Sequence, residues 1–211
     1  QTHNRRMPVF SFLGTMFRLL VFLCLLLFGH KAVCQSTAQM LGPQPLTLFE
    51  RTGGVHSATH TECIAYYEAL AARFPTHARL HSLGASDAGV PLHLFVIRAT
   101  ETPATVLPGK EAGEVRLFIL NGIHPGEPEG IDASMLLARE LLADARWAAL
   151  RRRVTVCIVP MYNIGGCLNR GCCSRANQNG PAEYGFRGNS QNLDLNRDCA
   201  KQDSREAQAL A

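Results

Sequence analysis

The feature that most constrains the fold of this chain is a strand, helix, strand succession in its second half. Val115–Leu120 (VRLFIL) and Val154–Val159 (VTVCIV) are short apolar runs bounded by turn residues, which is typical of buried strands. Residues 131–143 between them predict a helix with four leucines at core spacing: Leu136, Leu137, Leu141 and Leu142. A helix that connects two neighbouring strands of one sheet makes them parallel, so we expect a crossover unit.

Two further elements are expected before this unit. Thr59-His60-Thr61-Glu62 has the form of a capping box, and the apolar residues after it keep helical spacing until Pro75 stops the helix. Alternating runs at 79–83 and 92–98 flank the turn residues Asp87-Ala88-Gly89, which predicts an antiparallel hairpin. Hairpin and crossover together predict an α/β fold with a mixed central sheet flanked by helices.

The N-terminal part of the chain predicts export. Residues 19–29 (LLVFLCLLLFG) carry no charge, follow Arg5, Arg6 and Arg18, and precede the small-x-small pattern Ala32-Val33-Cys34. That order is typical of a secretory signal peptide, so we expect residues 1–34 to be removed and the protein to be periplasmic or secreted. The alternative is a membrane anchor through an uncleaved signal, although the clean run is about half of the roughly 20 apolar residues that span a bilayer.

Charge and cysteine content limit the partners and the cellular location that this protein can have. Lys and Arg exceed Asp and Glu by 21 to 17, and this net charge of +4 does not favour a nucleic-acid partner. Six of the eight cysteines lie beyond residue 34, which fits an exported protein. Cys167, Cys172 and Cys173 favour a disulfide over a zinc site because no C-x-x-C pair is present, whereas Cys157 is expected to be a buried small hydrophobic residue.

The turn after the strand at 115–120 carries the first candidate site. His124 and Glu127 form an H-x-x-E pair within the Pro- and Gly-rich segment 121–130. Ligands of open α/β sheets gather at the carboxyl ends of strands, and imidazole and carboxylate at this spacing could bind one Zn²⁺. The alternative is a surface turn whose carboxylate caps the following helix.

The second candidate site lies in residues 184–198, at the end of the long Gly- and Asn-rich stretch 161–197. Arg187, Asn196 and Arg197 offer donors that match carboxylates, because the guanidinium fork binds them bidentately. The alternative is a solvated loop with ordinary surface arginines. A loop this long is uncommon in a compact domain unless it builds a site.

These segments together resemble the zinc metallocarboxypeptidases of the carboxypeptidase A-like family, exported bacterial members most of all. The resemblance rests on HPGE at 124–127, IVPMYNIGG at 158–166 and FRGNSQNLDLNRD at 186–198, which follow one another in the family's order. It implies that His124 and Glu127 are zinc ligands, that Arg187 is catalytic by polarising the scissile carbonyl, and that Asn196 and Arg197 bind the terminal carboxylate of a peptide or protein substrate.

The same resemblance implies that this chain carries part of an active site. The family's third ligand is a histidine after these motifs, yet no histidine follows His124. Its general-base glutamate and substrate-capping tyrosine also lie further on. We therefore expect residues 35–211 to be the N-terminal part of a catalytic domain, with the third ligand beyond residue 211 and no activity of this chain alone. The sequence makes no prediction of oligomeric state.

Two alternatives to a carboxypeptidase remain open at this point. A zinc amidase or murein-peptide hydrolase of the same fold would cleave a different bond with a similar metal site. A non-catalytic module would recognise carboxylates through Arg187 and Arg197 without hydrolysis.

Overall fold

The structure is a computed structural model that describes residues 43–98 and 115–211. The chain divides into two compact units, 1–44 and 45–211, and the architecture below is that of the second. The predicted signal at 1–34 lies outside the described residues. No helix within the described ranges is long and apolar enough to cross a membrane.

The elements of the second unit follow the predicted order, with short additional helices. In chain order they are α2 (Leu48–Arg51), α3 (His60–Arg73), β1 (Ala78–Ala85), β2 (Pro91–Ile97), β3 (Val115–Leu120), α4 (Glu129–Ala143), the 3-10 turn η1 (Ala145–Trp147), α5 (Ala148–Arg151), β4 (Val154–Val159), α6 (Ile164–Leu168), the 3-10 turn η2 (Leu195–Arg197) and α7 (Arg205–Leu210). The two apolar strands have the predicted bounds, and the other predicted elements differ by one or two residues at their ends.

The sheet is mixed, as predicted, with the order β1-β2-β4-β3. β1 and β2 form the antiparallel hairpin, and β2 also pairs antiparallel with β4. β3 and β4 are parallel and in register, with Phe118 opposite Cys157. The crossover through α4 therefore places the carboxyl ends of both parallel strands at one edge of the sheet.

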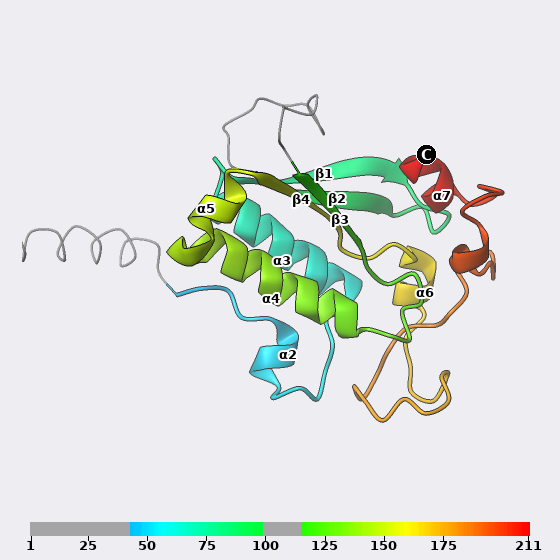
Figure 1. Cartoon of the computed structure of the whole chain (residues 1–211). Helices are drawn as coiled ribbons and strands as arrows, with labels where there is room; N and C mark the ends of the chain where they lie inside the picture. The colour runs from blue at the N-terminus through cyan, green and yellow to red at the C-terminus, as the bar shows by residue number, and fades with distance from the viewer. Residues whose placement is uncertain (1–42, 99–114) are drawn as a thin grey trace, which may run out of the picture. The chain divides into compact units, whose positions relative to one another are not determined.

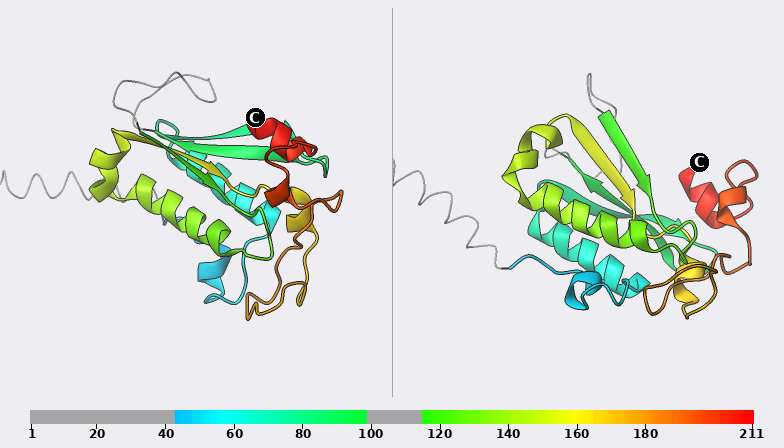
Figure 2. Two further views of the ribbon diagram at one scale, coloured as in Figure 1. Left: turned by 45° about the vertical axis from the view of Figure 1, so that its right-hand side comes forward. Right: turned by 60° about the horizontal axis from the view of Figure 1, so that its bottom comes forward.

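Helices α3 and α4 lie side by side over one face of the sheet (Figures 1 and 2). Tyr67 and Leu70 of α3 are fully buried there, and the Tyr67 ring lies 4.7 Å from that of Phe95. The opposite face is covered near one end by α7 and by the chain after β4. Its buried residues include Leu94, Cys157 and Leu195, and the burial of Cys157 confirms the prediction.

The buried stripe of α4 differs in part from the leucine stripe that the sequence predicted. Leu141 and Leu142 are buried as expected, but Leu136 is half-buried and Leu137 is exposed. The side chains that contact the core earlier in the helix are Ile131, Met135 and Ala138, one helical turn apart. Leucines lie on both candidate faces of α4, so leucine content alone does not decide which face is buried. The contact of α4 with α3 decides it.

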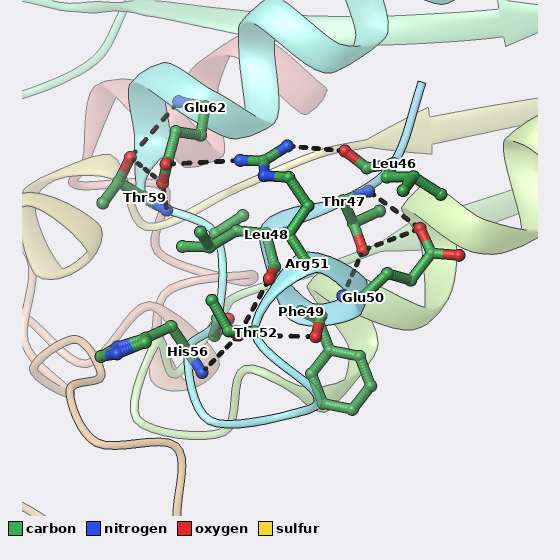
Figure 3. A network of polar contacts seen from close by, with 12 residues as sticks. Leu46, Thr47, Leu48, Phe49, Glu50, Arg51, Thr52, His56, Thr59 and Glu62 are labelled. Carbon is green, nitrogen blue, oxygen red and sulfur yellow. Dashed lines mark hydrogen bonds and ion pairs between the residues drawn. The ribbon is translucent and has the colours of Figure 1, made fainter. Parts of the chain in front are cut away.

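Capping boxes start both N-terminal helices. Thr59 accepts the Glu62 N–H, and Glu62 accepts the Thr59 N–H, which confirms the predicted box of α3. Thr47 and Glu50 repeat the pattern at α2, which the sequence reading missed. Figure 3 shows the two boxes joined by Arg51, whose guanidinium donates to the Leu46 carbonyl and lies 3.9 Å from Glu62 Oε1.

The predicted disulfide among Cys167, Cys172 and Cys173 is not present. All six cysteines of the described segments are free. Cys167 is buried in the core cluster beneath α3, whereas Cys172 and Cys173 lie on the surface. Cys167 therefore lies in a different environment from the other two, although the three are close in sequence.

Candidate functional site

The turn after β3 is fixed to the carboxyl end of β4 by backbone and side-chain hydrogen bonds. The buried side chain of Asn121 donates to the Val159 carbonyl at 3.3 Å and accepts from the Ser134 hydroxyl at 3.1 Å. Gly122 has φ of +64°, and a Cβ there would lie 3.2 Å from Ile131. A residue without a side chain is therefore needed where the chain leaves the strand.

His124 and Glu127 face each other across this turn. The Glu127 N–H donates to the His124 carbonyl at 2.9 Å, and His124 Nδ1 lies 3.4 Å from Glu127 Oε1. His124 is buried, whereas the Glu127 side chain is 43% exposed. No side chain caps α4, whose N-cap residue is Pro128, so the capping role considered for Glu127 is not observed.

The distance between these two atoms fits a shared metal ion. Two ligands at the usual Zn–N and Zn–O bond lengths, in tetrahedral geometry, lie about 3.3–3.5 Å apart. The turn therefore carries two side chains whose chemistry and spacing suit one Zn²⁺ ion. Within the described part of the chain, no group of three or more His, Cys, Asp or Glu side chains could hold a metal ion.

Asp194 joins the turn that carries His124 and Glu127 to the loop of the second candidate site. Its Oδ1 lies 2.9 Å from His124 Nε2, and its Oδ2 accepts from Arg187 Nη2 at 2.9 Å and from Nε at 3.2 Å. The hydrogen bond from His124, with further help from the Asn196 N–H and Arg187, lowers the pKa of Asp194 to about 2. An ionised Asp194 favours the proton of His124 on Nε2, which leaves the Nδ1 lone pair on the side of Glu127.

The sequence alone did not indicate Asp194 as a site residue, although Asp194 lies within FRGNSQNLDLNRD at 186–198. It also gave no indication of Arg175, whose Nη1 lies 2.7 Å from Glu127 Oε1. Asp194 is 70 residues from His124 in sequence. Neither hydrophobic periodicity nor turn residues can indicate a contact between residues so far apart. A carboxylate two residues before the Asn196-Arg197 pair was the available signal for Asp194. Arg175 stands in the Gly- and Asn-rich loop without a distinguishing neighbour.

Arg187 is positioned by the close approach of its loop to α6. The Phe186 N–H donates to the Gly166 carbonyl at 2.9 Å, and Asn163 Nδ2 donates to the Arg187 carbonyl at 2.8 Å. Asn163 is fully buried and also caps α6 by accepting the Gly166 N–H. The Arg187 guanidinium then lies beside the imidazole, with Nη1 3.3 Å from His124 Nδ1.

Asn196 and Arg197 lie on η2 with their side chains exposed. Leu195 is fully buried and anchors this turn, while Asp194 Oδ1 accepts the Asn196 N–H at 3.0 Å. Asp194 thus connects η2 to His124. Arg197 Nη1 donates to the Asn196 carbonyl, and Arg197 makes no ion pair with any residue in the described ranges. Its charge is open to an external carboxylate.

Of the five predicted site residues, the structure brings His124, Glu127 and Arg187 into direct proximity. Asn196 and Arg197 are linked to His124 through Asp194, and the described interactions include no direct contact of their side chains with His124 or Glu127. The arrangement combines two potential metal ligands, one guanidinium beside them and a second guanidinium facing solvent.

Comparisons with known proteins are consistent with this geometry. The family model for zinc carboxypeptidases matches residues 63–209. Among solved structures, a metallo-carboxypeptidase from Burkholderia cenocepacia is similar at 23% identity and a TM-score of 0.52, covering 73% of this chain and 37% of that one. A metallo-carboxypeptidase from Pseudomonas aeruginosa, in complex with (2-guanidinoethylmercapto)succinic acid, has 17% identity and a TM-score of 0.51 over 73% and 36% of the two chains.

Bovine thrombin-activatable fibrinolysis inhibitor, in complex with tick carboxypeptidase inhibitor, has 14% identity and a TM-score of 0.52 over 74% of this chain and 54% of that one. At these identities the likeness concerns the fold. The chain spans between about a third and a half of the length of these three structures. A search of curated protein sequences found no match.

Proposed function

The chain belongs to the zinc carboxypeptidase family, and from this membership we propose that residues 35–211 are part of the catalytic domain of a zinc-dependent metallocarboxypeptidase. The substrate is a peptide or protein with a free C-terminus, and the reaction is hydrolysis of its last peptide bond. The observation that carries the proposal is the convergence of His124, Glu127, Asp194 and Arg187 at the carboxyl end of the parallel strand pair.

His124 and Glu127 would hold the zinc ion. A bound zinc supplies Lewis-acid polarisation of the scissile carbonyl and activation of a water nucleophile. Asp194 accepts the hydrogen bond from His124 Nε2 and so keeps Nδ1 available as a ligand. Glu127 Oε1 also pairs with Arg175 at 2.7 Å, so a positive charge lies beside this carboxylate.

Arg187 provides positive charge beside the ligand pair. Its side chain is 47% exposed and is held by two hydrogen bonds to Asp194 Oδ2. A guanidinium fixed in this way before substrate arrives stabilises negative charge that develops on the carbonyl oxygen, with little reorganisation. Its Nη1 makes no bond to Asp194 and lies 3.3 Å from His124 Nδ1, so one of its two N–H groups remains for the substrate.

Asn196 and Arg197 would bind the terminal carboxylate of the substrate. The Arg197 guanidinium is exposed and without an internal carboxylate partner in the described structure, and Asn196 adds a neutral amide donor. Recognition of a free α-carboxylate at this position distinguishes a carboxypeptidase from a zinc amidase or a murein-peptide hydrolase.

The metal proposal is tested on the 211-residue chain by isothermal calorimetry with zinc. With two protein ligands, we expect weak binding and no peptide hydrolysis. His124→Ala should weaken the binding further, and the matched control His81→Ala, a histidine on β1, should not. Binding that is unaffected by His124→Ala would contradict the assignment of the ligand pair.

The substrate proposal is tested on the natural gene product that carries this sequence. Peptides with a free C-terminus should be cleaved, and the same peptides with an amidated C-terminus should be cleaved at least about tenfold more slowly, because Arg197 loses its charged partner. Equal turnover of both would contradict the carboxypeptidase assignment, and preference for γ-linked glutamyl peptides would favour the murein-peptide alternative.

We also propose that the protein is exported. The support is the order of basic residues, apolar run and small-x-small pattern within residues 1–34. A mature N-terminus near Gln35 would agree with cleavage of this segment.

A further inference from the structure

Two adjacent cysteines form an exposed pair on the loop after α6. Cys172 and Cys173 are both on the surface, and Cys173 Sγ donates to Cys172 Sγ at 2.7 Å. Among the other cysteines of the described segments, Cys199 is exposed and the rest are buried. The proposed hydrolase chemistry uses neither Cys172 nor Cys173.

The surrounding loop holds the two sulfur atoms together. Cys173 has φ of +69°, a left-handed conformation that a residue with a side chain adopts at a cost. Its N–H donates to the Tyr184 hydroxyl at 2.8 Å, and the Tyr184 ring is buried. Gly171, the residue before the pair, makes both backbone hydrogen bonds of a bridge with Tyr184 at 3.0 Å. Tyr184 therefore fixes the backbone on both sides of Cys172.

We propose that Cys172 and Cys173 are a redox-active vicinal dithiol, which closes reversibly to a disulfide between neighbouring residues. The oxidant is a disulfide compound, either a small molecule or a thiol–disulfide exchange protein. The Cys172 thiolate attacks one sulfur of the oxidant and releases one thiol. Cys173 loses its proton and attacks Cys172 Sγ, which releases the second thiol. The two cysteines lose two electrons and two protons, and the oxidant gains them as two thiols.

The roles of the two sulfurs follow from their hydrogen bond. Cys173 is the donor, and this bond to Cys172 raises the pKa of the Cys173 thiol. A thiol with a raised pKa loses its proton less readily, which favours Cys172 as the first nucleophile.

Adjacency makes the closed form easy to reduce. Neighbouring Cα atoms across a trans peptide are about 3.8 Å apart, below the spacing of roughly 4.4–6.8 Å that disulfides prefer. Strained and exposed disulfides are more oxidising than structural ones and belong to the labile class. The pair is therefore suited to reversible redox change rather than to permanent stabilisation of the loop.

The experiment follows a single tryptic peptide of the full 211-residue chain. Cleavage after Arg170 and Arg175 releases residues 171–175, which contain Cys172 and Cys173 as their only cysteines. The chain is treated with oxidised glutathione, quenched by alkylation and digested without reduction. We expect this peptide in a form lighter by two hydrogen atoms, and its formation in the native chain at least about tenfold faster than in guanidinium-unfolded chain, because the fold brings the sulfurs together.

Two variants separate the fold's contribution from simple adjacency. Tyr184→Phe removes the hydroxyl that holds the Cys173 N–H and should slow closure several-fold, with circular dichroism confirming that the variant is folded. Cys199→Ser removes another exposed thiol and should leave the rate unchanged. Equal rates in native and unfolded chains, or a peptide that carries glutathione without an internal link, would overturn the proposal.

Discussion

Glu50 and Arg139 show how one ion pair joins two helices. Arg139 Nη2 and Nη1 lie 2.5 and 2.7 Å from the two carboxylate oxygens of Glu50, a bidentate contact, and Nη1 also donates to the Pro45 carbonyl. Glu50 further accepts the Thr47 N–H (Figure 3). The hydrogen bond from Arg139 is the main cause that lowers the pKa of Glu50 to about 2, with Thr47 contributing. This pair ties α2 to α4.

A pH dependence of stability follows at the residue scale. The pKa of Glu50 in the folded chain, about 2, is below its ordinary value of 4.5. Its contribution is therefore fully present above pH 4.5 and is lost as the pH falls toward 2. We expect Glu50→Gln to lower the free energy of unfolding by about 1–2 kcal/mol at pH 7, a range that allows for the partial exposure of both side chains.

Urea unfolding of wild type and Glu50→Gln at pH 7, 4 and 2 measures this effect. The difference between the two proteins should shrink toward pH 2. Glu68→Gln, at an exposed position of α3, is the control and should change stability little at any of these pH values. A constant difference across the range would contradict the role of the Glu50 charge.

At the scale of elements, two glycines of helix α6 allow another segment of the chain to lie close to the helix backbone. A Cβ at Gly165 would lie 2.3 Å from the Ser190 nitrogen, and one at Gly166 would lie 2.3 Å from the Phe186 oxygen. Both obstructing atoms are backbone atoms of the loop that carries Arg187. The two glycines are therefore required for the position of the loop, although glycine disfavours a helix.

Gly166→Ala tests this packing. Alanine should raise helix propensity by up to about 1 kcal/mol, yet the contact with Phe186 should dominate and destabilise the chain by about 1–3 kcal/mol. Gly171→Ala is the matched control, since a Cβ there meets nothing within 4 Å. Thermal unfolding of both variants provides the measurement. An unchanged or raised melting temperature for Gly166→Ala would show that the loop can withdraw without cost.

At the scale of the whole unit formed by residues 45–211, the strands of the sheet differ in how far they are buried. Within the described structure, β3 is the last strand in the order β1-β2-β4-β3, and its neighbour β4 is buried along nearly its whole length. Three apolar side chains of β3 are about half exposed: Val115, Leu117 and Phe118. An edge strand with exposed apolar side chains offers both hydrogen-bonding groups and hydrophobic surface to another chain.

We therefore expect the 211-residue chain to associate through β3 at concentrations on the order of 100 µM. Sedimentation velocity of the wild-type chain should show oligomers, and Phe118→Lys should shift the distribution toward monomer by adding charge at the edge. Val55→Lys, which changes an apolar residue of similar exposure away from the sheet, is the control and should leave association unchanged. A wild-type chain that stays monomeric would contradict this expectation.

Local patterns were sufficient for much of the architecture. The strands at 115–120 and 154–159 were predicted with their observed bounds, because continuous apolar runs between turn residues have few other stable conformations. The capping box of α3 was predicted because its donors and acceptors lie within four residues. The proximity of His124 and Glu127 followed from the same short range, since one turn holds both.

The remaining features depend on contacts between segments far apart in sequence. The sequence by itself determined the types of the longer elements, the mixed sheet and the H-x-x-E turn, since these follow from periodicity, turn residues and the order of strands and helices. Only the tertiary structure decided which face of α4 is buried, that Asp194 reaches His124 across 70 residues, and that Tyr184 holds Cys172 and Cys173 together. The physical reason is that the packing of whole elements determines which distant side chains come into contact. The spacing of residues along one segment carries no information about that packing.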